Sequence, residues 1–371
     1  MLDWPVKRVG TKARNAWPPE VSPPMSPATT MPLASLPETF EAMAFDGGVA
    51  LSWRRFPLRA PGPHELLVRV RACGVCRTDL HIVDGELAPP ALPVVPGHEV
   101  VGTVLACGSL AEGFAVGDRV GVAWLHDTCL HCRWCDSGRE NLCPDARFTG
   151  LHVHGGYATH ALADARFCLH VPPAYGDVEA TPLLCAGLIG FRALRAAGDD
   201  ARRIGIYGFG AAGHLVAQAA LHEGREVFAF TRPGDEAAQA LARSLGASWA
   251  GDSSQPAPQP LDAALLFAPL GALVPKALLD VAPGGTVVCG GIHMSDIPSF
   301  PYRILWQERC VRSIANLTRA DGTGFMQMAE RFRFRVQTET YTLRDANFAL
   351  AQLRSGSITG AAVLDCTDGR G

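Results

Sequence analysis

Four cysteines crowd one short segment of the chain, and this segment constrains the fold more than any other feature. They are Cys129, Cys132, Cys135 and Cys143. Four thiolates in one loop can close a tetrahedron around Zn²⁺ with no position left for water or substrate, as in a structural zinc site. Unrelated buried cysteines are the alternative, and the close spacing argues against them. We therefore expect a long loop that a metal ion stabilises.

Glycines mark a second constrained segment. Gly208, Gly210 and Gly213 follow the apolar run RRIGIY and open the helical stretch AAGHLVAQAALHEG. In this strand–turn–helix setting the pattern is typical of a dinucleotide site, because the glycines let a pyrophosphate approach the backbone and the helix N-terminus. Further apolar runs, DAALLFAP and GGTVVCGGI, alternate with helical segments. This alternation predicts a parallel sheet covered on both faces.

The chain has 371 residues, more than the ~250–300 at which single cores stop growing, so we expect two domains. Strand-like runs separated by Gly, Pro and Asp predict a β-rich domain over residues 38–184, completed by residues 318–371. Residues 185–317 are predicted to form a doubly wound parallel-sheet (Rossmann) cofactor domain. Residues 1–37 are rich in Pro, Ser, Ala and Thr and are predicted to be a disordered extension, with an organelle transit peptide as the alternative.

Composition excludes several classes of partner. The net charge of −3 gives no electrostatic case for nucleic acid or for an anionic membrane. No apolar run approaches the ~20 residues of a membrane helix. Twelve cysteines would suit a secreted protein with disulfides. However, the opening MLDWPVKRVGTKARN lacks the apolar core of a secretory signal. We therefore expect a reduced, cytoplasmic protein whose thiolates bind metal.

A second group of metal-binding residue types is dispersed along the chain. Cys76 lies in CGVCRTDLH, His98 and Glu99 lie in VPGHEVVG, and Cys185 lies in PLLCAGLIG. Two thiolates and one imidazole would leave a fourth position open on Zn²⁺, as catalytic sites require. Taken singly, each residue has an ordinary explanation in core packing or a hydrogen-bonded turn. Spacing alone does not bring them together.

Several motifs resemble, in content and order, those of the zinc-containing medium-chain alcohol dehydrogenases, most closely the bacterial and yeast-type branch. They are GVCRTDLH, PGHEVVG, GDRVGVAW, CRWCDSGRENLC, GGYA and PLLCAG, and the resemblance runs from about Met43 to the C-terminus. It implies a GroES-like catalytic domain and a homo-oligomer, dimer or tetramer, formed through the cofactor domain. It also implies that Cys76, His98 and Cys185 hold a catalytic zinc ion, with Glu99 as a transient ligand.

The resemblance assigns roles to three residues that follow Cys76. Asp79 is expected to hydrogen-bond the imidazole of His98 and fix its orientation. Thr78 and His81 are expected to relay the proton of an alcohol to solvent. Without Cys76 and Asp79 beside it, an ordinary strand-edge threonine would be the better explanation of Thr78.

Other positions concern the cofactor and the substrate. The resemblance implies that Arg77 contacts the cofactor pyrophosphate and that Trp124 narrows the substrate pocket. Plain core packing of Trp124 is an equally good interpretation. The sequence departs from the family after Cys185, since Ile189 and Gly190 stand where a threonine is common.

The strand REVFAF ends in Thr231 and Arg232, where family members that bind NAD carry an aspartate for the ribose hydroxyls. A hydroxyl residue and a guanidinium suit a 2′-phosphate instead. This pattern predicts NADP, with NAD as the alternative if Arg232 is only a solvated loop residue.

The predicted function is a zinc-dependent alcohol dehydrogenase or aldehyde reductase. It would transfer hydride between a small primary or secondary alcohol, or an aldehyde, and NADP, with one catalytic and one structural zinc ion per chain. A polyol or aryl-alcohol dehydrogenase that uses NAD is the alternative enzyme. A non-catalytic nucleotide-sensing relative would have no reason to keep the following residues together: Cys76, Thr78, Asp79, His98 and Cys185.

Overall fold

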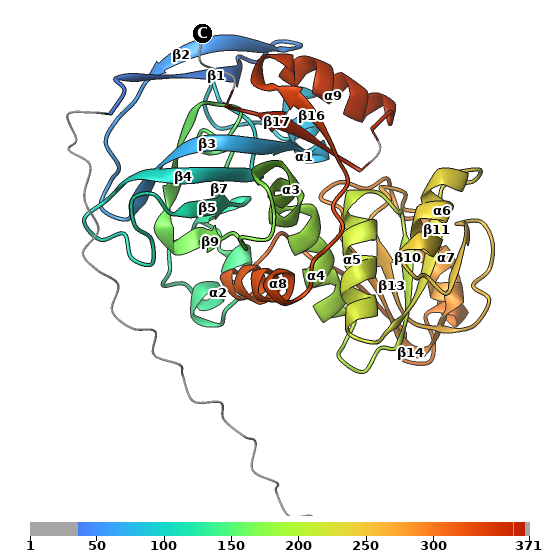
Figure 1. Cartoon of the computed structure of the whole chain (residues 1–371). Coiled ribbons are helices and arrows are strands. Elements are labelled where there is room, and N and C mark those ends of the chain that lie inside the picture. Colours follow the sequence, from blue (N-terminus) through green and yellow to red (C-terminus); the bar gives the residue numbers. More distant parts are fainter. Residues whose placement is uncertain (1–35, 359, 368–371) are drawn as a thin grey trace, which may run out of the picture.

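The computed structural model describes residues 36–358 and 360–367 (Figure 1). The predicted N-terminal extension therefore lies almost wholly outside the described residues. Two large sheets organise the described part of the chain, and two two-stranded sheets accompany them. The small sheets pair β1 (Thr39–Phe45) with β2 (Leu51–Pro57) and β6 (Leu125–Asp127) with β7 (Arg147–Phe148).

The first large sheet has seven strands, in the order β16-β17-β3-β4-β5-β9, with β8 also pairing with β3. Nearly every side chain of β3 is buried or half-buried, which explains its long apolar run. The C-terminal strand β17 pairs antiparallel with β3, so the end of the described chain rejoins the first sheet (Figure 1). The strands are β3 (Glu65–Val75), β4 (Val100–Cys107), β5 (Arg119–Val122), β8 (His160–Asp164), β9 (Cys168–His170), β16 (Thr338–Thr342) and β17 (Ala361–Asp365).

The second large sheet is parallel throughout and has the order β12-β11-β10-β13-β14-β15. This is the order of a doubly wound dinucleotide-binding sheet. Its central strands are almost fully buried, as strands covered on both faces must be. The strands are β10 (Arg203–Tyr207), β11 (Glu226–Thr231), β12 (Trp249–Asp252), β13 (Leu261–Leu266), β14 (Val281–Cys289) and β15 (Cys310–Ser313).

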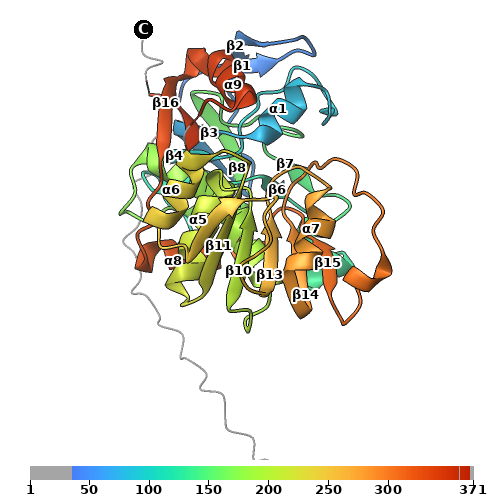
Figure 2. The same ribbon diagram turned by 90° about the vertical axis from the view of Figure 1, so that its right-hand side faces the viewer.

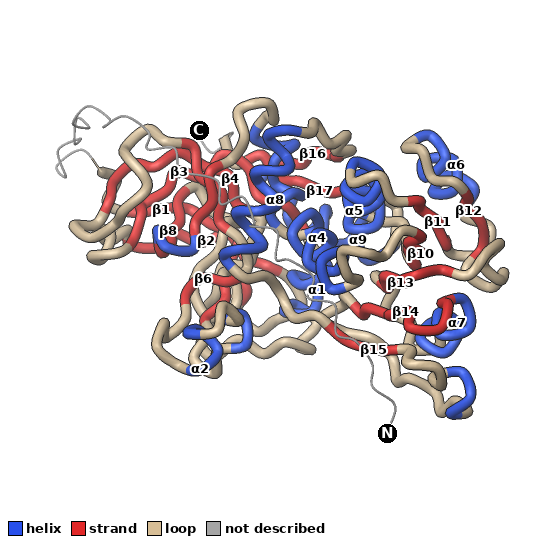
Figure 3. The backbone as a smooth tube through the Cα atoms, turned by 90° about the horizontal axis from the view of Figure 1, so that it is seen from below, coloured by secondary structure: helices blue, strands red, loops and turns tan. Residues whose placement is uncertain are grey.

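Helices cover both faces of the parallel sheet. Figure 3 shows α5 and α6 on one side and α7 on the other, as right-handed crossovers in opposite directions from the central strand require. Figure 2 shows the parallel strands side by side below the first sheet. The helices are α1 (Arg77–Val83), α2 (Arg133–Asp136), α3 (Asp177–Ala180), α4 (Ala186–Ala196), α5 (Ala211–His222), α6 (Glu236–Ser244), α7 (Leu273–Asp280), α8 (Arg319–Arg331) and α9 (Ala346–Ser355).

This architecture confirms the predicted fold class, a β-rich unit combined with a doubly wound parallel sheet. Within the described part of the chain, no helix has the length and apolarity needed to cross a bilayer.

Candidate functional site

The dispersed metal-binding residue types converge at one point. One potential ligand atom from each of Cys76, His98, Glu99 and Cys185 lies within 4.8 Å of the others. The sulfur atoms of Cys76 and Cys185 are 3.8 Å apart. Zn–S bonds of ~2.3 Å at tetrahedral angles place two sulfur ligands about 3.8 Å apart. The arrangement thus fits a zinc ion without rearrangement of the two thiols.

Helix α1 positions Cys76 through its N-terminal cap. Cys76 is the N-cap residue, and the carboxylate of Asp79 accepts a hydrogen bond of 2.8 Å from the Cys76 N–H. The same carboxylate accepts a bond of 3.0 Å from the Gly97 N–H, in the turn before His98. Its oxygen lies 3.5 Å from Nδ1 of His98, which is long for a hydrogen bond but leaves this nitrogen facing the acid. Asp79 therefore orients both potential ligands.

Burial shapes the chemistry of this cluster. The pKa of Cys76 is held well below its ordinary value, first by the hydrogen bond with Cys185 and also by contacts with His98. Burial raises the pKa of Glu99 well above its ordinary value, and the negative charge of Cys76 adds to this rise. Several buried acidic groups can ionise together only when a cation neutralises them. The donor set therefore suits a divalent metal ion.

At position 74, only glycine leaves room for the side chain of Glu99. A Cβ atom on Gly74 would lie 2.1 Å from Oε2 of Glu99, so the acid side chain occupies the space above this glycine. Gly97 adopts a φ of +96°, which strongly favours glycine, and its turn presents His98 and Glu99 to the site.

The clustered cysteines form the second group of potential metal ligands. The sulfur of Cys135 lies 3.6 Å from that of Cys132 and 3.9 Å from that of Cys129, and the sulfur of Cys143 lies 3.5 Å from that of Cys129. All twelve cysteines fall within the described residues, and all are free thiols. Backbone N–H groups at the start of α2, first that of Cys135, lower the pKa of Cys132 to about 7. Four close thiols without disulfides fit a closed tetrahedral site.

The loop that carries these cysteines also contacts the segment between β15 and α8. The short helix η2 (Glu140–Leu142) precedes Cys143. The buried carboxylate of Glu140 accepts hydrogen bonds from the backbone N–H (2.9 Å) and the side chain (3.2 Å) of Arg319. The amide of Asn141 donates a 2.6 Å bond to the carbonyl of Ala315. These contacts hold the segment that follows β15 against the cysteine loop.

The predicted relay and pocket residues lie beside the dispersed cluster. Thr78 is buried, with its hydroxyl 3.8 Å from the sulfur of Cys76. His81 lies one helical turn further along α1, on the same face as Thr78. The ring of Trp124 packs edge-on against His98, with 4.9 Å between the centroids, and stacks on Phe148. Trp124 is thus both buried and adjacent to the site.

The glycine turn after β10 has the geometry of a phosphate cradle. Gly208 adopts a φ of +97° in the tight turn. A Cβ atom on Gly213 would lie 2.3 Å from the carbonyl oxygen of Gly208, so helix and strand pack too closely for a side chain. Gly210 faces open space. These are the three roles that a dinucleotide turn gives its glycines: the turn, the close helix packing and the room for a pyrophosphate.

At the end of β11, only one of the two predicted side chains is available to a ligand. Thr231 is 1% exposed, and its hydroxyl contacts the carbonyl oxygens of Gly251 (3.3 Å) and Arg232 (3.2 Å). The side chain of Arg232 is 78% exposed and lies 3.8 Å from the carboxylate of Asp235. Arg77 is also exposed, at the start of α1.

Comparison with known proteins decides the family. The alcohol dehydrogenase GroES-like domain matches residues 62–173. The "Probable alcohol dehydrogenase AdhA" of Mycobacterium tuberculosis (strain CDC 1551 / Oshkosh) is 46% identical over 347 residues, covering 92% of this chain and 99% of the relative. The chain belongs to the zinc-containing medium-chain alcohol dehydrogenase family. An alcohol dehydrogenase of Geobacillus stearothermophilus is 34% identical and covers 81% of this chain and 91% of its own length.

Solved structures of this family share the fold. A cinnamyl alcohol dehydrogenase from Sorghum bicolor superposes with a TM-score of 0.81 at 28% identity, over 90% of this chain and 99% of its own. An acetophenone reductase from Geotrichum candidum, solved in complex with NAD, has a TM-score of 0.79 at 28% identity, over 89% and 98% of the two chains. The relatives and the ligand geometry support zinc and a nicotinamide cofactor for this alcohol dehydrogenase.

The departure from the family pattern at Gly190 has a packing reason. A Cβ atom there would lie 3.0 Å from Cβ of Val216, so glycine allows α4 to approach α5 closely. Sequence reasoning missed Tyr157, whose buried hydroxyl donates a 3.2 Å bond to Asp79. The GGYA motif contains this tyrosine, but only the fold brings it to an acid 78 positions away.

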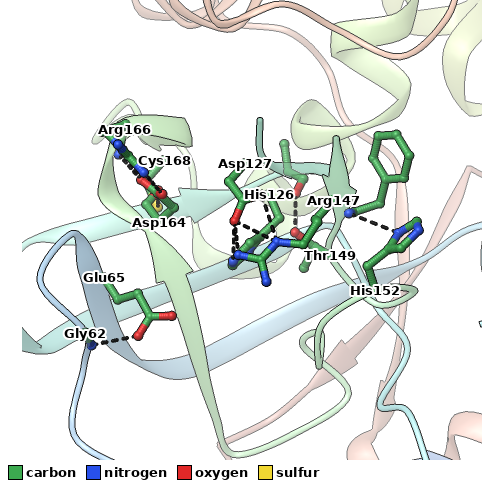
Figure 4. Close-up of polar contacts among 12 residues, drawn as sticks. Gly62, Glu65, His126, Asp127, Arg147, Thr149, His152, Asp164, Arg166 and Cys168 are labelled. Atoms are coloured by element: carbon green, nitrogen blue, oxygen red, sulfur yellow. Dashed lines mark hydrogen bonds and ion pairs between the residues drawn. The ribbon is translucent and has the colours of Figure 1, made fainter. Parts of the chain in front are cut away.

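A surface hollow of about 340 Å³ shares no lining residue with either group of potential metal ligands. Figure 4 shows Arg147 reaching back to Asp127 beside His126, with the pair Arg166 and Asp164 nearby. Each arginine of the hollow already contacts a carboxylate, and Arg59 contacts Glu65 in the same way. The charges cancel in pairs, so this hollow is a network of ion pairs rather than a site for a charged ligand.

Proposed function

We propose that this alcohol dehydrogenase is zinc-dependent and transfers hydride between a small primary or secondary alcohol, or an aldehyde, and NADP. The observation that carries the proposal is the convergence of Cys76, His98, Glu99 and Cys185 within 4.8 Å of one another. Cys76, His98 and Cys185 would hold the catalytic ion, with Glu99 as a transient ligand. Zinc bound there would supply Lewis-acid polarisation of the substrate oxygen, and the nicotinamide would supply or accept the hydride.

The remaining chemistry falls to side chains of the chain itself. The hydroxyl of Thr78 would take the alcohol proton, and His81, on the same face of α1 and closer to solvent, would carry it outward. Asp79 accepts a hydrogen bond from the N–H of Cys76 at the start of α1 and faces Nδ1 of His98. It therefore positions both of these potential ligands. The aromatic pair of Trp124 and Phe148 excludes water from the region beside His98.

An aryl alcohol is the second candidate substrate, because the stacked rings of Trp124 and Phe148 present a flat apolar wall near the site. Initial rates with primary, secondary, polyol and aryl alcohols and the matching carbonyl compounds, each with NAD and NADP, test the proposal. We expect activity with small alcohols and aldehydes and a preference for NADP. Absence of turnover with every pair would contradict the proposed enzyme and favour a nucleotide-sensing role.

The preference for NADP rests on Arg232. β11 ends without an acidic residue, the hydroxyl of Thr231 faces the backbone, and the exposed guanidinium is free to turn from Asp235 toward a 2′-phosphate. We expect Arg232→Ala to raise the KM for NADP by about ten- to a hundredfold, the equivalent of a charge-assisted hydrogen bond of ~1.5–3 kcal/mol. The KM for NAD should stay nearly constant.

Arg202→Ala is the matched control, because Arg202 is exposed at the start of β10, the opposite end of the parallel strands. It should leave both KM values unchanged. A wild type that prefers NAD, or an Arg232→Ala variant that loses both cofactors equally, would refute the NADP assignment and leave the dehydrogenase assignment intact.

We also propose a homo-oligomer, dimer or tetramer, formed through the cofactor domain. β15 is the edge strand of the parallel sheet, and the nearby side chains of Tyr302 and Trp306 are 69% and 59% exposed. An uncovered edge strand beside exposed aromatic residues favours association. Light scattering coupled to size exclusion should give at least twice the chain mass, and Trp306→Lys should lower it. A wild type of single-chain mass at micromolar concentration would contradict this proposal.

A further inference from the structure

Two histidines from different domains contact each other beside α1, the helix that also carries Thr78. The ring of His81, in α1, lies 5.4 Å from the ring of His293, centroid to centroid, with an interplanar angle of 44°. His293 belongs to the loop that follows β14, at the carboxyl end of the parallel sheet where such sheets bind their ligands. The contact therefore links the helix that carries Thr78 with the domain that is expected to hold the cofactor.

A carboxylate completes this group. Nδ1 of His81 makes a hydrogen bond with Glu86, five positions later. The turn after α1 makes this bond possible: Gly85 adopts a φ of +79°, and the N–H of Leu87 donates a 2.9 Å bond to the carbonyl of His81. The pKa of Glu86 is lowered, first by the hydrogen bond from His81 and further by the charges of His81 and His293.

The loop that carries His293 is anchored two residues later. The N–H of Ser295 donates a 3.2 Å bond to the carbonyl of Pro269, and its hydroxyl accepts a 2.9 Å bond from the N–H of Gly271. Both partners belong to the loop after β13. The position of His293 is thus set by the parallel sheet, whereas Glu86 and His81 are set by α1.

The hydrogen bond to Glu86 also fixes the tautomer of His81. A neutral imidazole has one N–H donor and one acceptor nitrogen. Because the carboxylate of Glu86 takes the donor at Nδ1, the other nitrogen, Nε2, is left as the acceptor for a proton. When Nε2 accepts a proton, the proton on Nδ1 can leave, so the imidazole returns to its neutral form.

We propose that His293 and Glu86 complete the proton exit of the enzyme, so that the proton collected by His81 reaches solvent through a group that spans both domains. This inference rests on the proposed function of His81. An N–H bond forms at Nε2 of His81 and the one at Nδ1 breaks; the released proton passes by Glu86 to the imidazole of His293, which is exposed and returns it to water. Glu86 and His293 touch neither substrate nor cofactor; they carry the proton onward after His81 has released it.

The charged surroundings of His81 are simple. Glu86 and His293 contact it, and Arg77 stands one turn earlier on the same face of α1. From α9, Arg354 pairs with Asp84 at the end of α1. Glu86 is therefore the acidic group that contacts His81.

Replacement of His293 tests the proposal. We expect His293→Gln to lower kcat/KM for alcohol oxidation about tenfold, less than the ~10²–10⁴ that a general base itself contributes. Added imidazole, a diffusible base, should restore the rate, and the KM for cofactor should change by less than twofold. Glu86→Gln should lower the rate by a similar factor and gain from imidazole in the same way, because the carboxylate that accepts the Nδ1 proton is lost.

A control and a second readout separate this inference from the proposed function. His222→Gln, on α5, should behave as the wild type and gain nothing from imidazole. In the absence of cofactor, the NMR chemical shifts of the His81 ring should change in both His293→Gln and Glu86→Gln, because each substitution removes a direct contact of this ring. A wild-type rate and pH profile in His293→Gln, or a loss that imidazole does not restore, would overturn the inference. Failure of the wild type to oxidise any alcohol would instead refute the proposed function.

Discussion

Cys76→Ser is expected to abolish alcohol oxidation and to leave the fold intact. The substitution keeps the volume of the side chain but replaces a soft anionic ligand by a hydroxyl that zinc binds poorly. A Lewis-acid ion contributes several kcal/mol to transition-state stabilisation, and about 4 kcal/mol corresponds to a thousandfold rate. We therefore expect kcat/KM to fall at least about a thousandfold. His98→Ala should have the same effect, since His98 supplies the third proposed ligand.

The fold should survive these substitutions because the cluster of Cys129, Cys132, Cys135 and Cys143 is separate. Circular dichroism and thermal unfolding of Cys76→Ser should therefore resemble those of the wild type. Cys107→Ser is the matched control, since Cys107 is a half-buried thiol outside both clusters, and it should keep full activity. Activity above a tenth of the wild-type value in Cys76→Ser would show that Cys76 is not a ligand of the proposed catalytic ion.

Cys132→Ser is expected to lower the melting temperature. Loss of one of four thiolates would release a structural ion and with it the loop that carries Glu140 and Asn141. These buried residues bind Arg319 and Ala315 in the segment between β15 and α8, so a loosened loop also frees this segment. We expect Tm to fall by about 5–10 °C. At roughly 2–4 °C per kcal/mol for a large domain, this fall corresponds to a loss of ~2.5 kcal/mol in the free energy of unfolding.

Glu140→Gln separates the effect of the metal from that of the loop contacts. It weakens the charge-assisted bonds to Arg319 but leaves all four cysteines in place. A smaller fall in Tm with unchanged metal content is the expected result. If Cys132→Ser melted at the wild-type temperature, the cluster would have no structural role. If Cys76→Ser unfolded the protein as well, the structural role would belong to the cluster that contains Cys76 and not to the cluster that contains Cys132.

Local patterns in the sequence predicted the group of clustered cysteines and the glycine turn. The clustered cysteines lie within one loop, so spacing alone brings them together. The roles of Gly208, Gly210 and Gly213 follow from a strand–turn–helix unit that is contiguous in the chain. Convergence of Cys76, His98 and Cys185 could be expected only from the family resemblance, because it depends on how distant segments pack.

Contacts between distant segments could not be predicted. The hydroxyl of Thr231 was expected at the adenosine ribose, but pairing of β11 with β12 places it against Gly251. Likewise, Tyr157 reaches Asp79 because the loop before β8 bonds to the carbonyls of Pro96 and Gly97. His293 meets His81 because the loop after β14 lies against α1. Neither contact has a sequence signal, since each residue taken alone resembles an ordinary loop or core residue.

The zinc content of three purified proteins tests the central claim most directly. Elemental analysis of the wild type, Cys76→Ser and Cys132→Ser should give zinc-to-chain ratios of two, one and one, because the two clusters share no residue. The wild type alone should oxidise alcohols at the full rate. One zinc ion or fewer in the wild type, or two in either variant, would contradict the assignment of a catalytic and a structural site.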